Sequence, residues 1–369
     1  MIDILKILKR SWHILWNYKV LWIFGFLLVV TGGMGGSGNG RLTYQGQETN
    51  GRPPLSAPRF EDRFPWLAEA NQWIEQHIDP LFVTEERAFQ TLIWLALAGM
   101  ALVLILAIPL MLIYYPSSTA VIRMVDDYEQ TGARVGFRQG WKLGWNRAAF
   151  RLWVIDLIVH LPVLVFIASI LGLGFWIFRL VEGSQRAVAV AGVVAAVGCT
   201  FLLIFLFTIV MVVLRLLREF FWRAAVLENL DVRASFRRGW EIFKRHWQSG
   251  ALMWLAMLGI RIGYAILGII ATFLLIPVMI LTGLAGAIVA AIPAFLVGGL
   301  ISLFAPTWVA VLVGLLVAAP FFLLILASPL LLIDGWVTIY ESSVWTLTFR
   351  EMKALEELAP QTELPAPAE

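Results

Sequence analysis

The chain has 369 residues, of which 60% are hydrophobic and 14% are charged, and its formal net charge is +3. This composition excludes an ordinary soluble domain, which carries fewer apolar residues. The small net charge, without a single basic patch, also argues against a nucleic-acid partner. One cysteine, Cys199, excludes an intramolecular disulfide.

Five long apolar stretches and a shorter one at Val20–Val30 recur along the chain. In order they are Val20–Val30, Thr91–Tyr114, Leu152–Phe178, Ala187–Leu214, Ile262–Leu281 and Trp308–Ile333. About 20 mostly apolar residues make a helix long enough to cross a bilayer. Lipid leaves unpaired amides no partner, so spanning segments are helices or closed barrels, and barrel strands alternate apolar with polar residues. The sequence therefore predicts an all-α, polytopic integral membrane protein with about six spans.

A short motif recurs before the hydrophobic spans. Gly136–Trp141 (GFRQGW) reappears 99 residues later as Ser235–Trp240 (SFRRGW), and the N-terminus holds a weaker copy around Trp12. Each copy has aromatic and apolar residues at helical spacing, with basic residues elsewhere, as in a helix lying in the membrane interface. The alternative is a partner-binding helix. The expected interfacial anchors are Trp12, Trp16, Trp141, Trp145, Trp240 and Trp247.

These copies divide one membrane domain, 1–369, into three repeat units. Each unit would be an interfacial helix followed by a transmembrane hairpin, and the three cover approximately 1–115, 116–216 and 217–350. Residues 32–90 form an extracytoplasmic loop with a short amphipathic helix at Trp66–Ile78, and 351–369 form a tail. Residues 283–304 are rich in Gly and Ala around Pro293, and we expect a re-entrant helical pair there, with a full span as the alternative.

Basic residues set the expected orientation. The connections that precede Val20, Leu152 and Ala251 carry 18 Lys and Arg residues, whereas the two alternating connections carry 7. By the positive-inside rule the first set faces the cytoplasm. We therefore expect a multi-pass protein of the cytoplasmic membrane with a cytoplasmic N-terminus, and the re-entrant pair would place the C-terminus on the same side.

Ionisable residues inside spans are candidates for a functional site. Asp156 and His160 stand at i and i+4, so their side chains can meet, and the repeat offset places Arg261 at a similar depth. In a polar site His160 would exchange protons, Asp156 would orient it, and Arg261 would hold an anion. In the structural interpretation, Arg261 extends to the interface and the site does not exist. No catalytic, metal or cofactor motif is found.

The residues around the repeat resemble a known family. Ala224–Glu228 (AAVLE), Ser235–Trp240 and the closing Thr346–Glu351 (TLTFRE) are similar to bacterial multi-pass proteins named after the membrane domain of a glycerophosphodiester phosphodiesterase. The resemblance covers most of the chain apart from 32–90. It implies a stand-alone member without the catalytic domain, so no phosphodiesterase activity is implied.

We expect a non-catalytic membrane protein, an accessory or scaffold component of the cytoplasmic membrane or of a larger membrane complex. Its partners would be membrane lipids and other membrane subunits. The alternative is a transporter or lipid-handling permease with an intramembrane polar site, because internal repeats and broken helices are transporter features.

Overall fold

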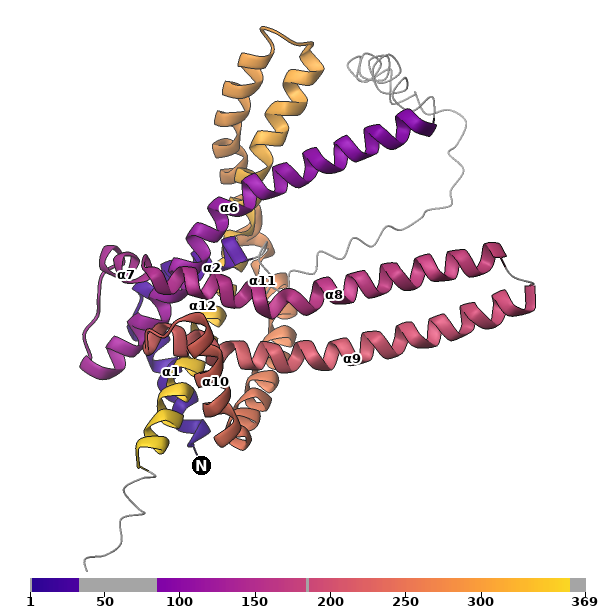
Figure 1. Cartoon of the computed structure of the whole chain (residues 1–369). Coiled ribbons are helices and arrows are strands. Elements are labelled where there is room, and N and C mark those ends of the chain that lie inside the picture. The colour runs from indigo at the N-terminus through magenta and orange to yellow at the C-terminus, as the bar shows by residue number, and fades with distance from the viewer. Residues whose placement is uncertain (1, 33–84, 184–185, 359–369) are drawn as a thin grey trace, which may run out of the picture. The chain divides into compact units, whose positions relative to one another are not determined.

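The computed structural model describes residues 2–32, 85–183 and 186–358. In these ranges all regular structure is helical (Figure 1), which confirms the expected all-α fold. The chain divides into two compact units, each built from separate stretches. Unit 1 contains Met1–Leu28, Tyr114–Ala265 and Gly335–Glu369, and unit 2 contains Val29–Ile113 and Ile266–Asp334.

Each of the six expected apolar stretches lies within a helix. The helices are α1 (Ile4–Asn17), α2 (Val20–Gly32), α6 (Glu85–Thr131), α7 (Phe137–Gly144), α8 (Arg147–Gly183), α9 (Arg186–Leu227), α10 (Val232–Arg245), α11 (Trp247–Ile301) and α12 (Thr307–Leu358). Among the described residues, five helices are long and apolar enough to cross a membrane, and α1 with α2 adds a sixth if that bent pair is one span. The chain is therefore a helical membrane protein by length and composition.

A short helix precedes a long one at two places, α7 before α8 and α10 before α11, and at the N-terminus two short helices, α1 and α2, follow each other. α1 and α2 meet at a 99° bend. The carboxylate of Asp3 accepts a hydrogen bond from the backbone N–H of Lys6 at 3.0 Å and so caps α1. Between α7 and α8, the side-chain oxygen of Asn146 accepts from the N–H of Ala148 at 2.7 Å. Asn146 thus caps α8 and fixes the break after α7.

The core of unit 1 lies where the short helices pack against the ends of the long ones. Side chains with no exposed surface include Ile14, Leu21, Phe24, Met124, Ile242 and Met253. The hydroxyl of Tyr18 donates to the carbonyl of Val135 at 3.0 Å and accepts from its N–H at 2.7 Å, which ties the α6–α7 connection to the α1–α2 bend. These contacts bring α1, α2, α6, α10 and α11, which are distant in sequence, together in one core.

Glycines permit close helix packing in each unit. In unit 1, a Cβ added to Gly25 would lie 2.5 Å from the carbonyl oxygen of Gly335. In unit 2, Gly298 of α11 packs against the backbone of α12 at Ala310, where an added Cβ would stand 3.0 Å from the carbonyl oxygen. Small residues of this kind let helix backbones approach where lipid gives no hydrophobic drive for association.

The expected re-entrant pair at 283–304 is wrong. Residues to Ile301 continue α11 without a break, with Pro277 and Pro293 inside the helix, and the chain reverses only before α12 begins at Thr307. A helical proline removes one N–H donor and strains the preceding turn. Helices in lipid keep such prolines because they retain the remaining backbone bonds. The central proline therefore does not mark a reversal.

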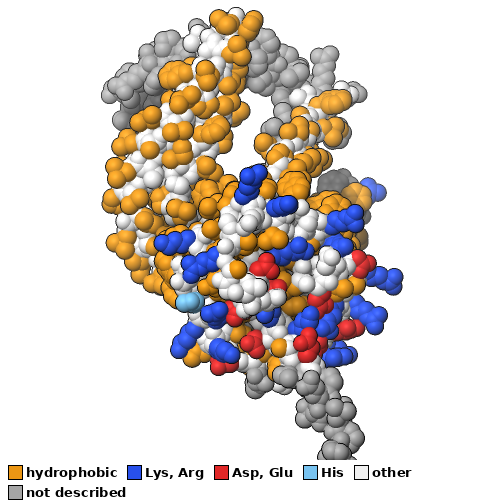
Figure 2. Space-filling view, turned by 90° about the vertical axis from the view of Figure 1, so that its left-hand side faces the viewer, with side chains coloured by type: hydrophobic (Ala, Val, Ile, Leu, Met, Phe, Trp, Pro, Cys, Tyr) orange, Lys and Arg blue, Asp and Glu red, His pale blue; other side chains and the backbone are white. Residues whose placement is uncertain are grey.

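Several boundaries differ from the expected ones. α6 begins at Glu85, so residues 85–90 belong to a helix and not to the long loop. The expected repeat boundaries after residues 115 and 216 fall inside α6 and α9. The expected outer helix at Trp66–Ile78 lies outside the described residues. Figure 2 shows mostly hydrophobic side chains over the upper part of the view, with Lys, Arg, Asp and Glu gathered in its lower part.

Candidate functional site

Asp156 is the centre of a buried polar network in unit 1. Its side chain, on α8, is about 5% exposed. One carboxylate oxygen accepts a hydrogen bond from the hydroxyl of Tyr115 on α6 at 3.1 Å. The other accepts from the guanidinium of Arg218 on α9, also at 3.1 Å. The carboxylate thus joins three helices, and its negative charge is matched by a buried arginine.

His160 meets Asp156, as the i, i+4 spacing predicts. Nδ1 of its ring lies 2.7 Å from the backbone oxygen of Asp156 and 3.8 Å from one carboxylate oxygen. The histidine side chain is 37% exposed, so one edge of the network reaches the surface of the described structure. Asp156 and His160 are therefore neighbours, with the aspartate buried and the histidine at the exposed edge of the network.

Arg261 forms its ion pair with a different residue. Its Nε and NH2 nitrogens donate to the two carboxylate oxygens of Glu341 on α12, each at 2.7 Å. Two parallel bonds of this kind are the strong geometry for an arginine and a carboxylate. The arginine that pairs with Asp156 is Arg218, so the three expected site residues do not share a direct contact.

Two further charged residues of α9 complete the network. Arg223, with a side chain 2% exposed, pairs with Glu219 one turn earlier and donates to the backbone oxygen of Ser342 on α12 at 3.2 Å. Glu219 also lies 3.5 Å from Arg218. The apolar run ends at Leu214, so the sequence predicted that these residues lie in a connection between two spans. The i, i+4 spacing of Glu219 and Arg223 was the signal available.

The charges in this network balance. Three arginines face three acids: Arg218, Arg223 and Arg261 against Asp156, Glu219 and Glu341. A buried charge is costly in an apolar region unless it is paired and hydrogen-bonded. The Asp156–Arg218 pair joins α8 to α9, and the bond from Arg223 to Ser342 joins α9 to α12. The Arg261–Glu341 pair, in which the arginine is 56% exposed, joins α11 to α12, so the arrangement can hold four helices in a fixed register.

A second ion-pair cluster joins the short helix α10 to α12. Arg238 bonds to Glu228 at 3.2 Å and to Glu356 at 2.8 Å, and Lys353 lies 3.3 Å from Glu228. Burial lowers the pKa of Arg238, but the two acids raise it by more, so the net shift is upward. On the exposed face of α10, a hydrogen bond from Arg237 lowers the pKa of the Glu241 carboxylate. Arg238 therefore stays charged and fastens α10.

The expected anchor tryptophans lie on or beside the short helices. Five are about half exposed, namely Trp12, Trp16, Trp145, Trp240 and Trp247. Trp141 is more buried and packs against the unit 1 core. Trp12 and Trp16 contact each other edge to face at 5.7 Å between ring centroids, and Trp141 stacks on Trp145 at 6.0 Å. These rings are available to a surrounding interface.

The sequence profile described as "Family of unknown function (DUF7544)" matches residues 9–349. The chain belongs to this family. No curated protein and no solved structure matches the chain significantly. The family match includes every member of the Asp156 network. It ends before Lys353 and Glu356 of the second cluster.

The description of this family names no reaction and no substrate. What the protein can do chemically must therefore be inferred from the site itself. Within the described residues there is no group of three or more His, Cys, Asp or Glu side chains that could hold a metal ion. What the Asp156 network can do is hold fixed charges in an apolar region, with the imidazole of His160 at its exposed edge.

Proposed function

We propose that this chain is a non-catalytic accessory or scaffold protein of a cytoplasmic membrane, with lipids and other membrane subunits as partners. The balance of charges in the Asp156 network supports this proposal most directly. A substrate site must keep groups free for the substrate, whereas here each acid is already engaged by an arginine of the same chain. The network then serves to fix helices and not to pass a ligand.

We also propose that the three helix pairs α1–α2, α7–α8 and α10–α11 are copies of one unit. A glycine at the same position of two copies supports this: Gly140 of α7 and Gly239 of α10 stand 99 residues apart, and both are buried. A Cβ on Gly140 would lie 2.5 Å from Sδ of Met124, and one on Gly239 would lie 2.6 Å from Cδ1 of Phe221. α7 and α10 thus each pack through a glycine on the helix before them.

We propose that the chain shares the architecture of the membrane domain of glycerophosphodiester phosphodiesterase, which its motifs resemble. Residues of these motifs form ion pairs within unit 1. Glu228 of the first motif pairs with Arg238 of the second, and Arg350 of the closing motif pairs with Asp126. This arrangement supports a shared architecture of the membrane domain and gives no support to phosphodiester cleavage.

For orientation we propose that both termini are cytoplasmic. The basic asymmetry of the connections supports this, and so does the even number of crossings if α1 and α2 count as one span. A membrane-impermeant thiol reagent should label a cysteine placed in residues 32–50 from outside and leave one at Glu129 unlabelled. The reverse pattern would overturn the orientation.

The alternative function is a transporter or lipid-handling permease, and one observation favours it. Three donors of α9 have no acceptor in the described part of the chain: Nε of Arg218, Nε of Arg223 and Nε1 of Trp222. Buried donors without partners are costly, so water or an anion held there would stabilise them. Because His160 is partly exposed, a ligand bound there would have a path to the surface of the protein.

Ion flux in proteoliposomes separates the two functions. The purified protein is reconstituted with a pH-sensitive dye inside, and a valinomycin-driven potassium potential is applied. The scaffold proposal expects proton flux equal to that of empty liposomes, at pH 6 and at pH 8, for the wild type and for Asp156→Asn. A protein-dependent flux that Asp156→Asn abolishes and that Arg237→Met, an exposed control on α10, preserves would establish the permease.

A further inference from the structure

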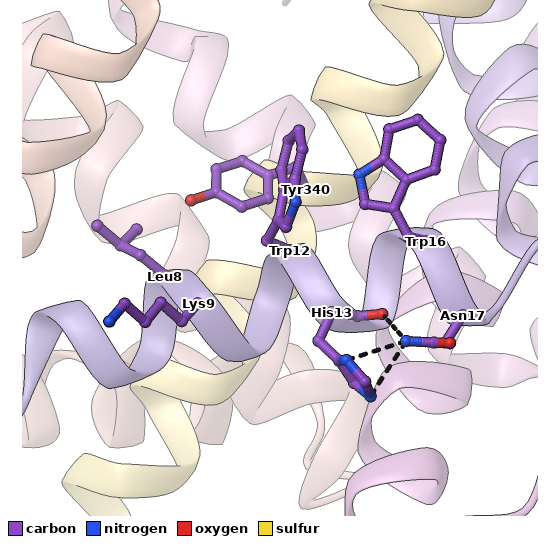
Figure 3. Close-up of a pocket in the computed structure, with 7 residues that line it drawn as sticks. All are labelled: Leu8, Lys9, Trp12, His13, Trp16, Asn17 and Tyr340. Atoms are coloured by element: carbon purple, nitrogen blue, oxygen red, sulfur yellow. Dashed lines mark hydrogen bonds between the residues drawn. The ribbon is translucent and has the colours of Figure 1, made fainter.

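The outward face of α1 carries two parallel rows of side chains (Figure 3). Leu8, Trp12 and Trp16 form an apolar row at intervals of four residues, and Lys9, His13 and Asn17 form a polar row beside it. With Tyr340 from α12 these residues line an open groove of about 560 Å³. That volume falls within the range of small-molecule sites.

The apolar row is already ordered. Trp12 contacts Trp16 at 5.7 Å and Tyr340 at 6.1 Å between ring centroids, both edge to face. Trp16 also contacts Trp22 and Trp336 at 5.6 Å. Nevertheless Trp12 is 55% exposed and Trp16 is 42% exposed. The rings therefore form a fixed apolar wall with a free side.

The polar row is basic. Lys9 is exposed and makes no ion pair with any residue that the structure describes, and the side-chain amide of Asn17 donates to the backbone oxygen of His13 at 2.9 Å. An adjoining groove of about 460 Å³ shares Lys9 and His13 and adds Lys6, Arg10 and the acid Asp3. Arg10 is paired with Glu129 at 2.9 Å, and the two lysines outnumber Asp3, so the net charge of this groove is positive.

We propose that this groove binds the headgroup of an anionic glycerophospholipid. The phosphate would lie on Lys9 and His13, and the glycerol and first acyl carbons would lie against Trp12, Trp16 and Tyr340. α1 is followed after the bend by the apolar helix α2, so its depth matches that of headgroups, where amphipathic basic helices bind. Basic pockets at this level suit anionic lipids.

The charge of the groove selects among lipids. In a zwitterionic headgroup the ammonium would share the polar row with Lys9, and like charges repel. A glycerol headgroup has no ammonium and leaves the phosphate charge uncompensated for Lys9. Phosphatidylglycerol should therefore bind better than phosphatidylcholine. This inference requires only that the chain lies in a membrane, and it holds whether the protein is a scaffold or a permease.

Native mass spectrometry of the delipidated full-length protein in detergent tests the proposal. The protein is titrated separately with dioctanoyl phosphatidylglycerol, dioctanoyl phosphatidylcholine and inorganic phosphate. Lys9→Gln and Trp12→Leu change the groove. Lys244→Gln and Trp240→Leu are matched controls, because they alter an exposed lysine and an exposed tryptophan on α10 outside the groove. Each variant must first show the wild-type melting temperature without lipid, and His13→Gln replaces Lys9→Gln if that variant does not.

The expected result is tighter binding of phosphatidylglycerol than of phosphatidylcholine. Lys9→Gln should raise the Kd for phosphatidylglycerol about fivefold, the effect of one basic residue near an anionic surface, and Trp12→Leu should also raise it. The two α10 variants should leave it within about twofold. Equal effects of the α1 and α10 variants would overturn the proposal. So would equal affinity for the two lipids, or inorganic phosphate binding as tightly as phosphatidylglycerol.

Discussion

Gly144 lets α7 lie directly against α6. A Cβ at this position would stand 2.1 Å from the carbonyl oxygen of Pro116 and 2.9 Å from Cβ of Ala120. Neither neighbour is the end of a flexible side chain, so the helices themselves would have to move. The close approach at Gly144 therefore holds the short helix in place, and the requirement is steric because its φ is not positive.

We predict that Gly144→Ala destabilises the protein by about 1–3 kcal/mol, the usual cost of overpacking. Gly172→Ala is the matched control, because Gly172 lies inside α8 with nothing within 4 Å of an added Cβ. There alanine should be neutral or stabilising by up to about 1 kcal/mol, since it favours the helix. Unfolding in mixed micelles measures both. Equal stabilities for the two variants would contradict the close contact.

At the same scale, local spacing predicted only part of the candidate site. The i, i+4 rule found the contact of Asp156 with His160, because both stand on one helix. It could not find Glu341 as the partner of Arg261, since 80 residues separate them and only helix packing brings them together. Arg218 was missed for a different reason: the hydrophobic run ends at Leu214, whereas α9 continues to Leu227.

At the scale of elements, α11 shows what proline does and does not decide. Composition predicted a reversal around Pro293, yet the helix runs from Trp247 to Ile301. The apolar stretches themselves were placed correctly, because a helix is the form that satisfies its amides in lipid. Where one helix ends depends on turn residues such as those between Ile301 and Thr307, and hydrophobicity does not reveal them.

The continuity of α11 can be measured directly. Leu284 and Leu300 are both exposed, and 16 helical residues span about 24 Å at 1.5 Å per residue. Spin labels on cysteines at these two positions, introduced after Cys199→Ser, should give a single distance near that value by double electron–electron resonance. A re-entrant pair would bring the labels to roughly half that distance, which would show that the helix is broken.

At the scale of the whole molecule, we propose that the Asp156 network holds the helices together. Charges from α8, α9, α11 and α12 neutralise one another, and Tyr115 adds α6. If this is their role, the stability of the protein depends on the pairs being intact. If the charges form a ligand site, they need not stabilise the fold, because functional polar groups in membranes are usually costly.

A double-mutant cycle on Asp156 and Arg218 tests this claim most directly. Arg218→Met should lower the unfolding free energy by about 3–5 kcal/mol, because it leaves a buried carboxylate unpaired, and Asp156→Asn in the same chain should recover at least about 1 kcal/mol of that loss. Arg237→Met should cost less than about 1 kcal/mol, since its pair with Glu241 is exposed. Additive effects of the two buried substitutions, or a loss at Arg218 no larger than that at Arg237, would contradict the structural role of the network.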